Sequence, residues 1–180
     1  TTSMLSHILL KGECDPTISV GGILPAIGGN IRVGQSETFL TEACEYTNSF
    51  LSFFPTLGII LNMDADHLDF FKDIDDIRHS FRKFAELLPA DGALIINADT
   101  PKYEMVAENL PCKVITYGLE HDAEYTASDI TYDEFGHPTF HVLHNGEDIG
   151  TCSLKVPGIH NVSNALASIA AGRLLGLDNE

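Results

Sequence analysis

The sequence has few basic residues for its length, and this shortage limits the partners that it can have. Its 180 residues include 26 Asp and Glu against 10 Lys and Arg, which gives a formal net charge of −16. A nucleic-acid groove or a site for an anionic membrane requires clustered Lys and Arg side chains. We therefore expect neither nucleic acid nor membrane among the partners, and we expect most of the acids to lie on solvated faces.

The sequence also lacks long apolar runs and closely spaced cysteines. No apolar stretch reaches the length of a membrane span, and no segment of signal-peptide type opens the chain. The cysteines form no C-x-x-C pair, which disfavours both a zinc site and a disulfide framework. We expect a soluble, cytoplasmic protein. Its four cysteines are expected to be buried thiols: Cys14, Cys44, Cys112 and Cys152.

What is present suits one α/β domain with a substantial core, because 44% of the residues are hydrophobic. Apolar, β-branched runs alternate with segments of helical period, which predicts a mostly parallel central sheet flanked by helices. The strands of this part are predicted at 57–61, 92–99 and 113–118, and its helices at 73–88 and 100–109. Thr100-Pro101 is typical of a helix N-cap followed by proline at the first helical position.

The two ends of the chain differ from this alternating middle part. Near the start, the pattern predicts a helix over 4–10, a strand over 17–20, a glycine-rich loop over 21–36, a strand over 38–45 and a short apolar helix over 50–54. Residues 124–156 have a period of two, and Asn145-Gly146 indicates a tight hairpin, so we predict a small antiparallel β annex there. An Ala-rich helix is predicted over 161–175.

The stretch from Asn62 to Asp69 is the first candidate for chemistry. It follows Leu57–Leu61, a run predicted to be a strand buried on both faces, and α/β sheets bind ligands at the carboxyl ends of their strands. A histidine among carboxylates can hold Mg²⁺ or Mn²⁺. From the residues alone, a second interpretation is equally good, in which Asp64 or Asp66 caps the following helix.

Another group of histidines lies in the predicted annex and is a weaker candidate for a metal site. His141 and His144 point to opposite faces of a strand, so we expect them to be surface residues, together with His137.

Three separated stretches together resemble a known family. They are Glu42-Ala43-Cys44-Glu45, the Asn62–Asp69 stretch, and Gly158-Ile159-His160-Asn161-Val162-Ser163-Asn164-Ala165-Leu166-Ala167. In this order and spacing they resemble the central ATPase domain of the Mur ligases, which has a fold like that of P-loop NTPases. The resemblance covers essentially all 180 residues, with Cys44 where the family usually has Asp. The opening Thr1-Thr2-Ser3-Met4 is similar to the residues that come after the family's phosphate loop, so that loop is expected just before residue 1.

The resemblance implies ATP and Mg²⁺ as cofactors. Glu42 and His67 match the family's magnesium-holding positions, with Glu42 expected on the strand next to His67. Asp64, Asp66 and Asp69 are then expected to support the site or cap a helix. Mg²⁺ bound to phosphate oxygens takes few protein ligands, which agrees with this small set.

The resemblance also implies residues that bind the nucleotide and the substrate. Asn161 and Asn164 match the family's adenine-contacting asparagines, with His160 beside them, and an amide offers the donor and the acceptor that an adenine edge needs. Without the other motifs, Asn161 would be interpreted simply as an N-cap. Glu45 and Asn30 are expected to face substrate. Lys83 is expected to be a surface residue.

The branch of the family that these motifs resemble most adds L-alanine to the carboxylate of UDP-N-acetylmuramate through an acyl phosphate, in peptidoglycan precursor synthesis. The chain is then expected to be the central domain of a three-domain ligase, truncated at its N-terminus just after the phosphate loop. A UDP-binding N-terminal domain and a C-terminal domain would lie outside it. As an isolated piece, the chain is expected to be inactive.

Three other functions stay open at this point. One is the recycling ligase that attaches a tripeptide to the same nucleotide. A folylpolyglutamate synthase-like enzyme is a less favoured ligase, because its motifs differ around residues 42–51. Another is a metal-dependent phosphohydrolase that uses Glu42, Asp64, Asp66 and His67 and predicts two metal ions about 3.5–4 Å apart. The last is a nucleotide-binding module without catalysis.

Overall fold

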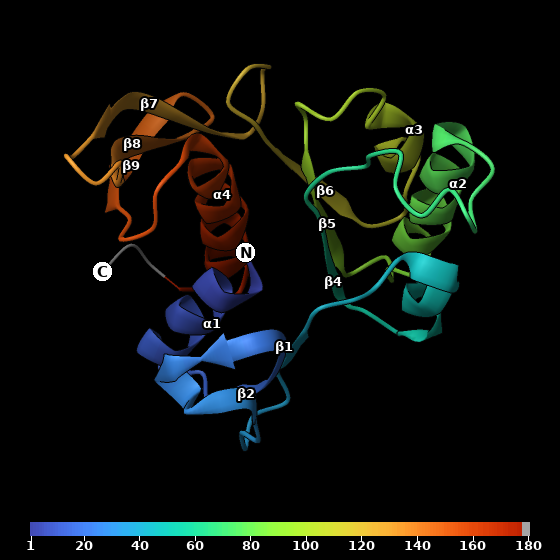
Figure 1. The fold of residues 1–180 in the computed structure, drawn as a ribbon, viewed down its shortest axis with the longest axis horizontal. Coiled ribbons are helices and arrows are strands. Elements are labelled where there is room, and N and C mark those ends of the chain that lie inside the picture. Colours follow the sequence, from blue (N-terminus) through green and yellow to red (C-terminus); the bar gives the residue numbers. More distant parts are fainter. Residues whose placement is uncertain (178–180) are drawn as a thin grey trace.

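The computed structural model describes residues 1–177 and places helices on both faces of a six-stranded sheet (Figure 1). Its strand order is β4 (Leu57–Ile60), β5 (Ala93–Asn97), β6 (Lys113–Tyr117), β7 (Tyr125–Tyr132), β8 (Pro138–His144) and β9 (Glu147–Ser153). Strands β4 to β7 are parallel, whereas β8 and β9 add antiparallel. The predicted fold class, a mostly parallel sheet flanked by helices, is confirmed.

The antiparallel part is not a separate annex, because β7 continues the parallel sheet. Tyr117 at the end of β6 lies opposite Tyr125 at the start of β7. The Asn145-Gly146 hairpin between β8 and β9 forms as predicted, and both residues have positive φ. The histidines of this part pair with acids: His137 with Asp133, His141 with Asp148, and His144 with Glu124.

Helices α1 (Thr2–Lys11) and α4 (Ile159–Leu174) pack on one face of the sheet, and α2 (Ile74–Ala85) and α3 (Glu104–Ala107) on the other. The side chains of β5 alternate between the two cores: Ile95 packs with α1 and α4, whereas Leu94 and Ile96 pack with α2. Every apolar residue of β5 from Ala93 to Ile96 is therefore buried. This is the pattern of a central parallel strand.

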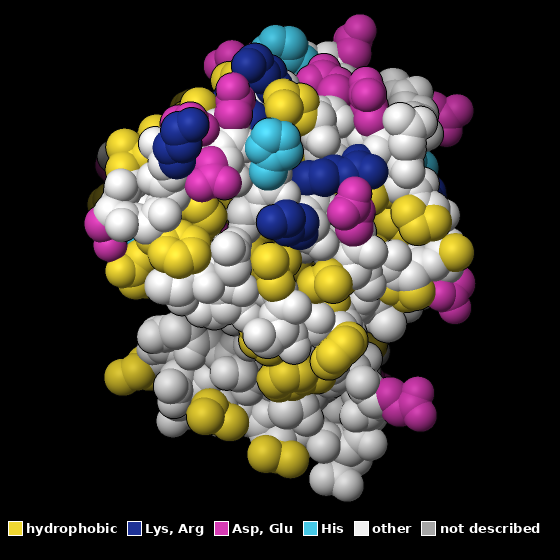
Figure 2. All heavy atoms as spheres, turned by 90° about the vertical axis from the view of Figure 1, so that its right-hand side faces the viewer, with side chains coloured by type: hydrophobic (Ala, Val, Ile, Leu, Met, Phe, Trp, Pro, Cys, Tyr) yellow, Lys and Arg dark blue, Asp and Glu magenta, His cyan; other side chains and the backbone are white. Residues whose placement is uncertain are grey.

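The outer face of α2 and α3 carries many of the charged side chains (Figure 2). Lys and Arg lie beside acids there: Arg78 and Lys102 both contact Asp75, at 2.6 and 3.6 Å, and Arg82 contacts Glu86 at 2.8 Å. Arg78, Arg82 and Lys102 are thus used in local ion pairs.

A second, three-stranded sheet lies beside α1 and corrects two predictions. Its order is β2 (Gly29–Arg32), β1 (Thr17–Leu24) and β3 (Phe39–Thr41), with β1 antiparallel to β2 and parallel to β3. The prediction of a loop over 21–36 was wrong, because η1 (Pro25–Ile27) and Gly28, at φ +68°, turn the chain back as β2. Since β3 pairs with β1, Glu42 does not lie on a strand next to β4.

Some element bounds also differ from the prediction. The helix over 100–109 was wrong in extent, because Lys102 has φ +61° and only Glu104–Ala107 are α-helical. Strand β3 ends at Thr41 and not at residue 45, and the short helix predicted over 50–54 is the 3₁₀ helix η2 (Tyr46–Ser52). Strand β4 is an edge strand and is not buried on both faces, because Ile60 is buried whereas Leu57 and Ile59 are only partly buried. Of the cysteines, only Cys112 is buried, and Cys44 is exposed.

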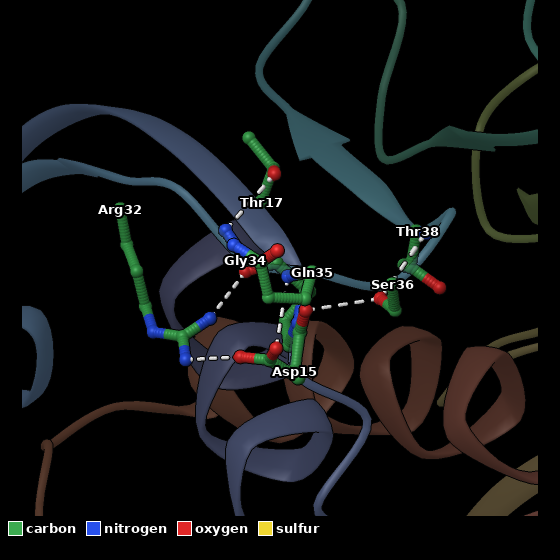
Figure 3. Close-up of polar contacts among 8 residues, drawn as sticks. Asp15, Thr17, Arg32, Gly34, Gln35, Ser36 and Thr38 are labelled. Atoms are coloured by element: carbon green, nitrogen blue, oxygen red, sulfur yellow. Dashed lines mark hydrogen bonds and ion pairs between the residues drawn. The ribbon is translucent and has the colours of Figure 1, made fainter.

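Asp15 organises the segment that connects β2 to β3 (Figure 3). Its side chain pairs with Arg32, which holds the pKa of the Asp15 carboxyl below its usual value, and it accepts the Gln35 N–H at 2.8 Å. The Asp15 carbonyl accepts the Ser36 hydroxyl at 3.0 Å. The Gly34 N–H donates to the Thr17 hydroxyl at 3.1 Å. This segment has no regular strand but a defined set of polar contacts.

Gly34→Ala is expected to destabilise this segment. A Cβ atom at residue 34 would lie 2.0 Å from the carbonyl oxygen of Asp15, which is backbone and cannot move aside easily. We expect a loss of about 1–3 kcal/mol in the free energy of unfolding, measured by urea denaturation. Gly22→Ala is the matched control, because an added Cβ there meets no atom within 4 Å. Equal stability of the two variants would contradict the packing argument.

Asp99 ties the carboxyl ends of β5 and β6 together. Its side chain accepts the backbone N–H groups of Leu119, Glu120 and His121 at 2.6, 3.1 and 2.9 Å. Partial burial acts to raise the pKa of the Asp99 carboxyl, but these hydrogen bonds and the His121 ring outweigh it, so the pKa lies below its ordinary value. The ionised form of Asp99 therefore stabilises the fold.

Asp99→Asn is expected to lower the free energy of unfolding by about 2 kcal/mol at neutral pH, because an amide meets these donors with one oxygen and brings its own N–H groups. Because the folded-state pKa is depressed, the contribution of Asp99 is present above about pH 4 and is lost as the pH falls through the folded-state pKa. The difference from wild type should therefore shrink on acidification in urea titrations. Exposed Asp122→Asn is the control, and a pH-independent difference would contradict this account.

Within residues 1–177, no helix is both long and apolar enough to cross a membrane.

Candidate functional site

The start of α1 brings together residues from three distant parts of the chain. The Thr1 hydroxyl donates to Asn164 Oδ1 at 2.7 Å, which joins the first residue to α4. Glu42 directly follows β3, and β3 packs against α1. A helix N-terminus presents free N–H groups and favours anions. The start of α1 is therefore suited to an anion.

Glu42 is held just beyond β3 by a contact with β1. Its Oε2 accepts the Gly21 N–H at 2.9 Å, and an added Cβ at residue 21 would lie 2.8 Å from that oxygen. The glycine therefore permits the close approach of the carboxylate. The side chain remains exposed, so a carboxylate oxygen is available to a cation next to the start of α1.

The two candidate adenine-binding asparagines lie in the first turns of α4. The Asn161 Nδ2 donates to the Pro157 carbonyl at 2.8 Å, and the Asn164 Nδ2 donates to Asn161 Oδ1 at 3.3 Å. Helix α4 starts two residues earlier than predicted and has Gly158 as its N-cap, so the interpretation of Asn161 as an N-cap was wrong. His160 is exposed on the same turn.

His67 lines a hollow of about 250 Å³ that lies at the end of β4. Its Nε2 lies 3.4 Å from Glu45 Oε1, and its ring lies against that of Tyr46 with centroids 4.7 Å apart. The Tyr46 hydroxyl donates to Asp69 at 2.8 Å, which raises the pKa of Tyr46. His67 has φ +53°, an uncommon backbone conformation for a residue other than glycine. Its backbone N–H donates to Asp66 Oδ1 at 2.7 Å, which helps to hold that conformation.

The structure joins some predicted site residues and separates others. Glu45, not Glu42, contacts His67, and Asp64 accepts from Asn62. Helix α2 is capped by Asp73, so the prediction that Asp64 or Asp66 caps it was wrong. Among the described residues, Asn30 is exposed in β2 and has no contact with the other candidates. Lys83 is exposed, as predicted.

The donor set fits a magnesium ion that takes most of its ligands from elsewhere. In the described part of the chain, no three His, Cys, Asp or Glu side chains are grouped closely enough to hold a metal by themselves. Mg²⁺ is usually bound through one or two carboxylates plus phosphate oxygens and waters. Glu42 after β3 and His67 in the hollow after β4 are separate single donors, and each could supply such a small share.

Tyr46 and Thr1 were not singled out from the sequence. The sequence feature that could have identified Tyr46 as a site residue is its position next to Glu45. Its contacts with His67 and Asp69 depend on the kink in η2, where two residues have positive φ. The signal for Thr1 is its place at the start of a helix that follows the expected phosphate loop.

A larger groove, of about 1010 Å³, lies elsewhere, between α1, α4 and the β8–β9 hairpin. None of the candidate residues lines it. The candidate residues therefore lie in the smaller hollow and near the start of α1, not in this groove.

Comparisons with known proteins identify the family of this chain. The family model described as the Mur ligase middle domain matches residues 1–172. A UDP-N-acetylmuramate–L-alanine ligase of Lachnospira eligens is 61% identical over 181 residues, which cover all of this chain and 39% of the relative. The corresponding enzyme of Caldanaerobacter subterraneus is 51% identical with the same coverage. The chain thus spans about two fifths of the length of the curated relatives that it matches.

Solved structures of two ligases are also similar to this chain. The UDP-N-acetylmuramate–alanine ligase of Thermotoga maritima superposes with a TM-score of 0.83 at 29% identity, over 98% of this chain and 39% of that one. A UDP-N-acetylmuramate:L-alanyl-γ-D-glutamyl-meso-diaminopimelate ligase of Neisseria meningitides gives a TM-score of 0.86 at 27% identity, over 98% and 58%.

Proposed function

Because this chain belongs to the Mur ligase family, as its middle domain, we propose that it forms the ATP-binding part of an enzyme that joins L-alanine to UDP-N-acetylmuramate. The observation that carries the proposal is the hydrogen bond between Thr1, at the start of α1, and Asn164 of α4, with β3, which leads to Glu42, packed against the same helix α1. These groups offer a carboxylate, an amide and a helix N-terminus, which suit a cation, a base and a phosphate chain. The identity of 61% to an L-alanine ligase supports the choice of amine.

The proposed reaction forms an acyl phosphate on the substrate carboxylate, which the amine of L-alanine then attacks. Phosphoryl transfer depends mainly on positioning and charge stabilisation. We assign Asn161, Asn164 and His160 to the adenine end of ATP, and the start of α1 to its phosphates. Glu42 and His67 would hold Mg²⁺, which neutralises phosphate charge when it is bound. Glu45 would orient His67 through their 3.4 Å contact, and we assign Glu45 and Asn30 to the binding of substrate.

The remaining parts of the enzyme are also proposals. Since the chain spans 39% of its relatives, we propose that a UDP-binding N-terminal domain, a phosphate loop before Thr1 and a C-terminal domain complete the site in the intact cytoplasmic protein. The chain alone is then expected to show no alanine-dependent ATP hydrolysis.

The test uses the intact protein that carries this chain, assayed for ADP release with UDP-N-acetylmuramate, Mg²⁺ and either L-alanine or the tripeptide. Turnover with L-alanine and little with the tripeptide is the expected result. The reverse preference would establish the tripeptide ligase, which the TM-score of 0.86 to such an enzyme keeps as the second candidate. Hydrolysis of phosphate esters without ATP or an amine would support the phosphohydrolase instead, although no three potential ligands of residues 1–177 are grouped for metal binding. ATP binding without any turnover would support a non-catalytic module.

A further inference from the structure

Two consecutive residues of η2 and the residue just before it hold the ring of His67. The ring Nε2 lies 3.4 Å from Glu45 Oε1, and the face of the ring lies against Tyr46, with centroids 4.7 Å apart and ring planes at 31°. The Glu45 contact constrains one edge of the imidazole, whereas the Tyr46 contact constrains its plane. Because the χ2 torsion of histidine has broad minima, the plane needs a contact of its own.

Tyr46 also contacts the loop that carries His67 at a second point. This loop connects β4, which ends at Ile60, to α2, which starts at Ile74. The Tyr46 hydroxyl donates to Asp69 Oδ2 at 2.8 Å, two residues beyond His67. Tyr46 therefore holds both the imidazole and the loop from which it projects.

The other contacts of His67 fix its backbone more than its ring. Its φ of +53° is an uncommon conformation that persists where the surroundings support it. The His67 N–H donates to Asp66 Oδ1 at 2.7 Å, and its carbonyl accepts the N–H of Phe70 at 2.9 Å. The same Asp66 oxygen lies 3.9 Å from the ring Nδ1, but the Asp66 side chain is 78% exposed, so it is a weak partner for the ring.

Tyr46 belongs to a segment that the core fixes in place. The next residues of η2 contact α2: Asn48 Oδ1 accepts the Ser80 hydroxyl, and the buried ring of Phe50 stacks on Phe84 with centroids 5.0 Å apart. Helix α2 in turn packs on the sheet. The position of the Tyr46 ring is therefore set from outside the loop that it contacts.

We propose that Tyr46 is a positioning residue, which holds the imidazole of His67 in place at the hollow after β4 before a cation binds. This inference rests on the proposed function, because it assumes that His67 is a ligand of Mg²⁺. It adds a residue to that site. Groups that orient a metal ligand raise metal affinity, and their loss typically weakens binding by about 10–100-fold.

The test measures the affinity for Mn²⁺, a paramagnetic substitute for Mg²⁺, by electron paramagnetic resonance. It uses the intact protein that carries this chain, with a non-hydrolysable ATP analogue. We expect Tyr46→Leu, which removes the aromatic face and the hydroxyl, to weaken Mn²⁺ binding about tenfold. Tyr46→Phe keeps the ring and loses only the bond to Asp69, so a loss of about threefold is expected. Tyr132→Leu is the matched control, because Tyr132 is an exposed tyrosine of β7, and it should leave the affinity unchanged.

A double-mutant cycle with His67→Ala tests whether Tyr46 acts through His67. In the His67→Ala background, Tyr46→Leu should cause no further loss of Mn²⁺ affinity, because the ring that Tyr46 positions is gone. A merely structural role predicts the same loss in both backgrounds, and that result would overturn the inference.

The outcomes separate this inference from the proposed function. If His67→Ala weakens Mn²⁺ binding and Tyr46→Leu does not, the role of Tyr46 is wrong and the proposed function stands. If His67→Ala leaves Mn²⁺ binding unchanged, the metal assignment of His67 is wrong, and this inference with it. If Tyr46→Leu does not fold, Tyr46→Met takes its place in the cycle with the same expectations, because its flexible side chain fills irregular space better.

Discussion

Glu42→Gln is expected to reduce kcat of the intact ligase by about 100-fold or more, which corresponds to roughly 3 kcal/mol of transition-state stabilisation. Glu42 follows β3, which packs against α1, the helix proposed to bind the phosphates, and a neutral amide cannot balance the charge of the cation. The fold should survive, because the glutamine oxygen can still accept the Gly21 N–H that Glu42 accepts at 2.9 Å. Steady-state rates of ADP release over a range of Mg²⁺ concentrations measure the effect.

The control for charge alone is Glu37→Gln. Glu37 is exposed and lies in the segment between β2 and β3, so its removal changes the net charge equally. We expect that variant to remain within about twofold of wild type. If Glu42→Gln also stays within that range at every Mg²⁺ concentration, Glu42 does not hold the cation, and the metal assignment would have to shift to His67 and Glu45.

The sequence predicted the middle of the fold better than its start, and the reason is the range of the interactions. Strand β5 is a continuous apolar run, and α2 has an acidic first turn and an amphipathic pattern, so each is indicated by its own residues. The three-stranded sheet depends on pairing between β1 and β2 across a turn, and on Asp15 reaching residues 32–36. Local pattern does not show such contacts, so the glycine-rich segment was predicted as a loop.

The candidate site was predictable as a list of residues but not as a geometry. Motif resemblance singled out Glu42, His67 and Asn164, and the structure brings Glu42 and Asn164 to the start of α1. It gives His67 a contact with Glu45 instead. That difference follows from sheet topology, because β3 pairs with β1 and not with β4. Strand order is a nonlocal property, which a single sequence leaves open.

Phe140→Ala is expected to be the most destabilising of the proposed substitutions, with a loss of about 3–5 kcal/mol. Phe140 is fully buried in β8 and packs in the same core as Ile95, Tyr117 and Leu166, which belong to β5, β6 and α4. Truncation leaves a cavity that these neighbours can fill only in part. The measurement is urea denaturation followed by far-UV circular dichroism. Phe135→Ala is the control, because that ring is exposed and should change the free energy of unfolding by less than about 0.5 kcal/mol.

The shape of the transition tests the continuity of the sheet as well as its packing. If β7, β8 and β9 extend the parallel sheet through the Tyr117–Tyr125 pairing, Phe140→Ala should shift a single transition with an unchanged slope against urea. An independent β annex would instead unfold in a first step, with β4, β5 and β6 remaining protected from hydrogen exchange. Two transitions in the variant would show that the shared core of α1, α4 and the sheet does not couple the two parts. A single shifted transition would show that the antiparallel strands stabilise the helix that carries Asn161 and Asn164.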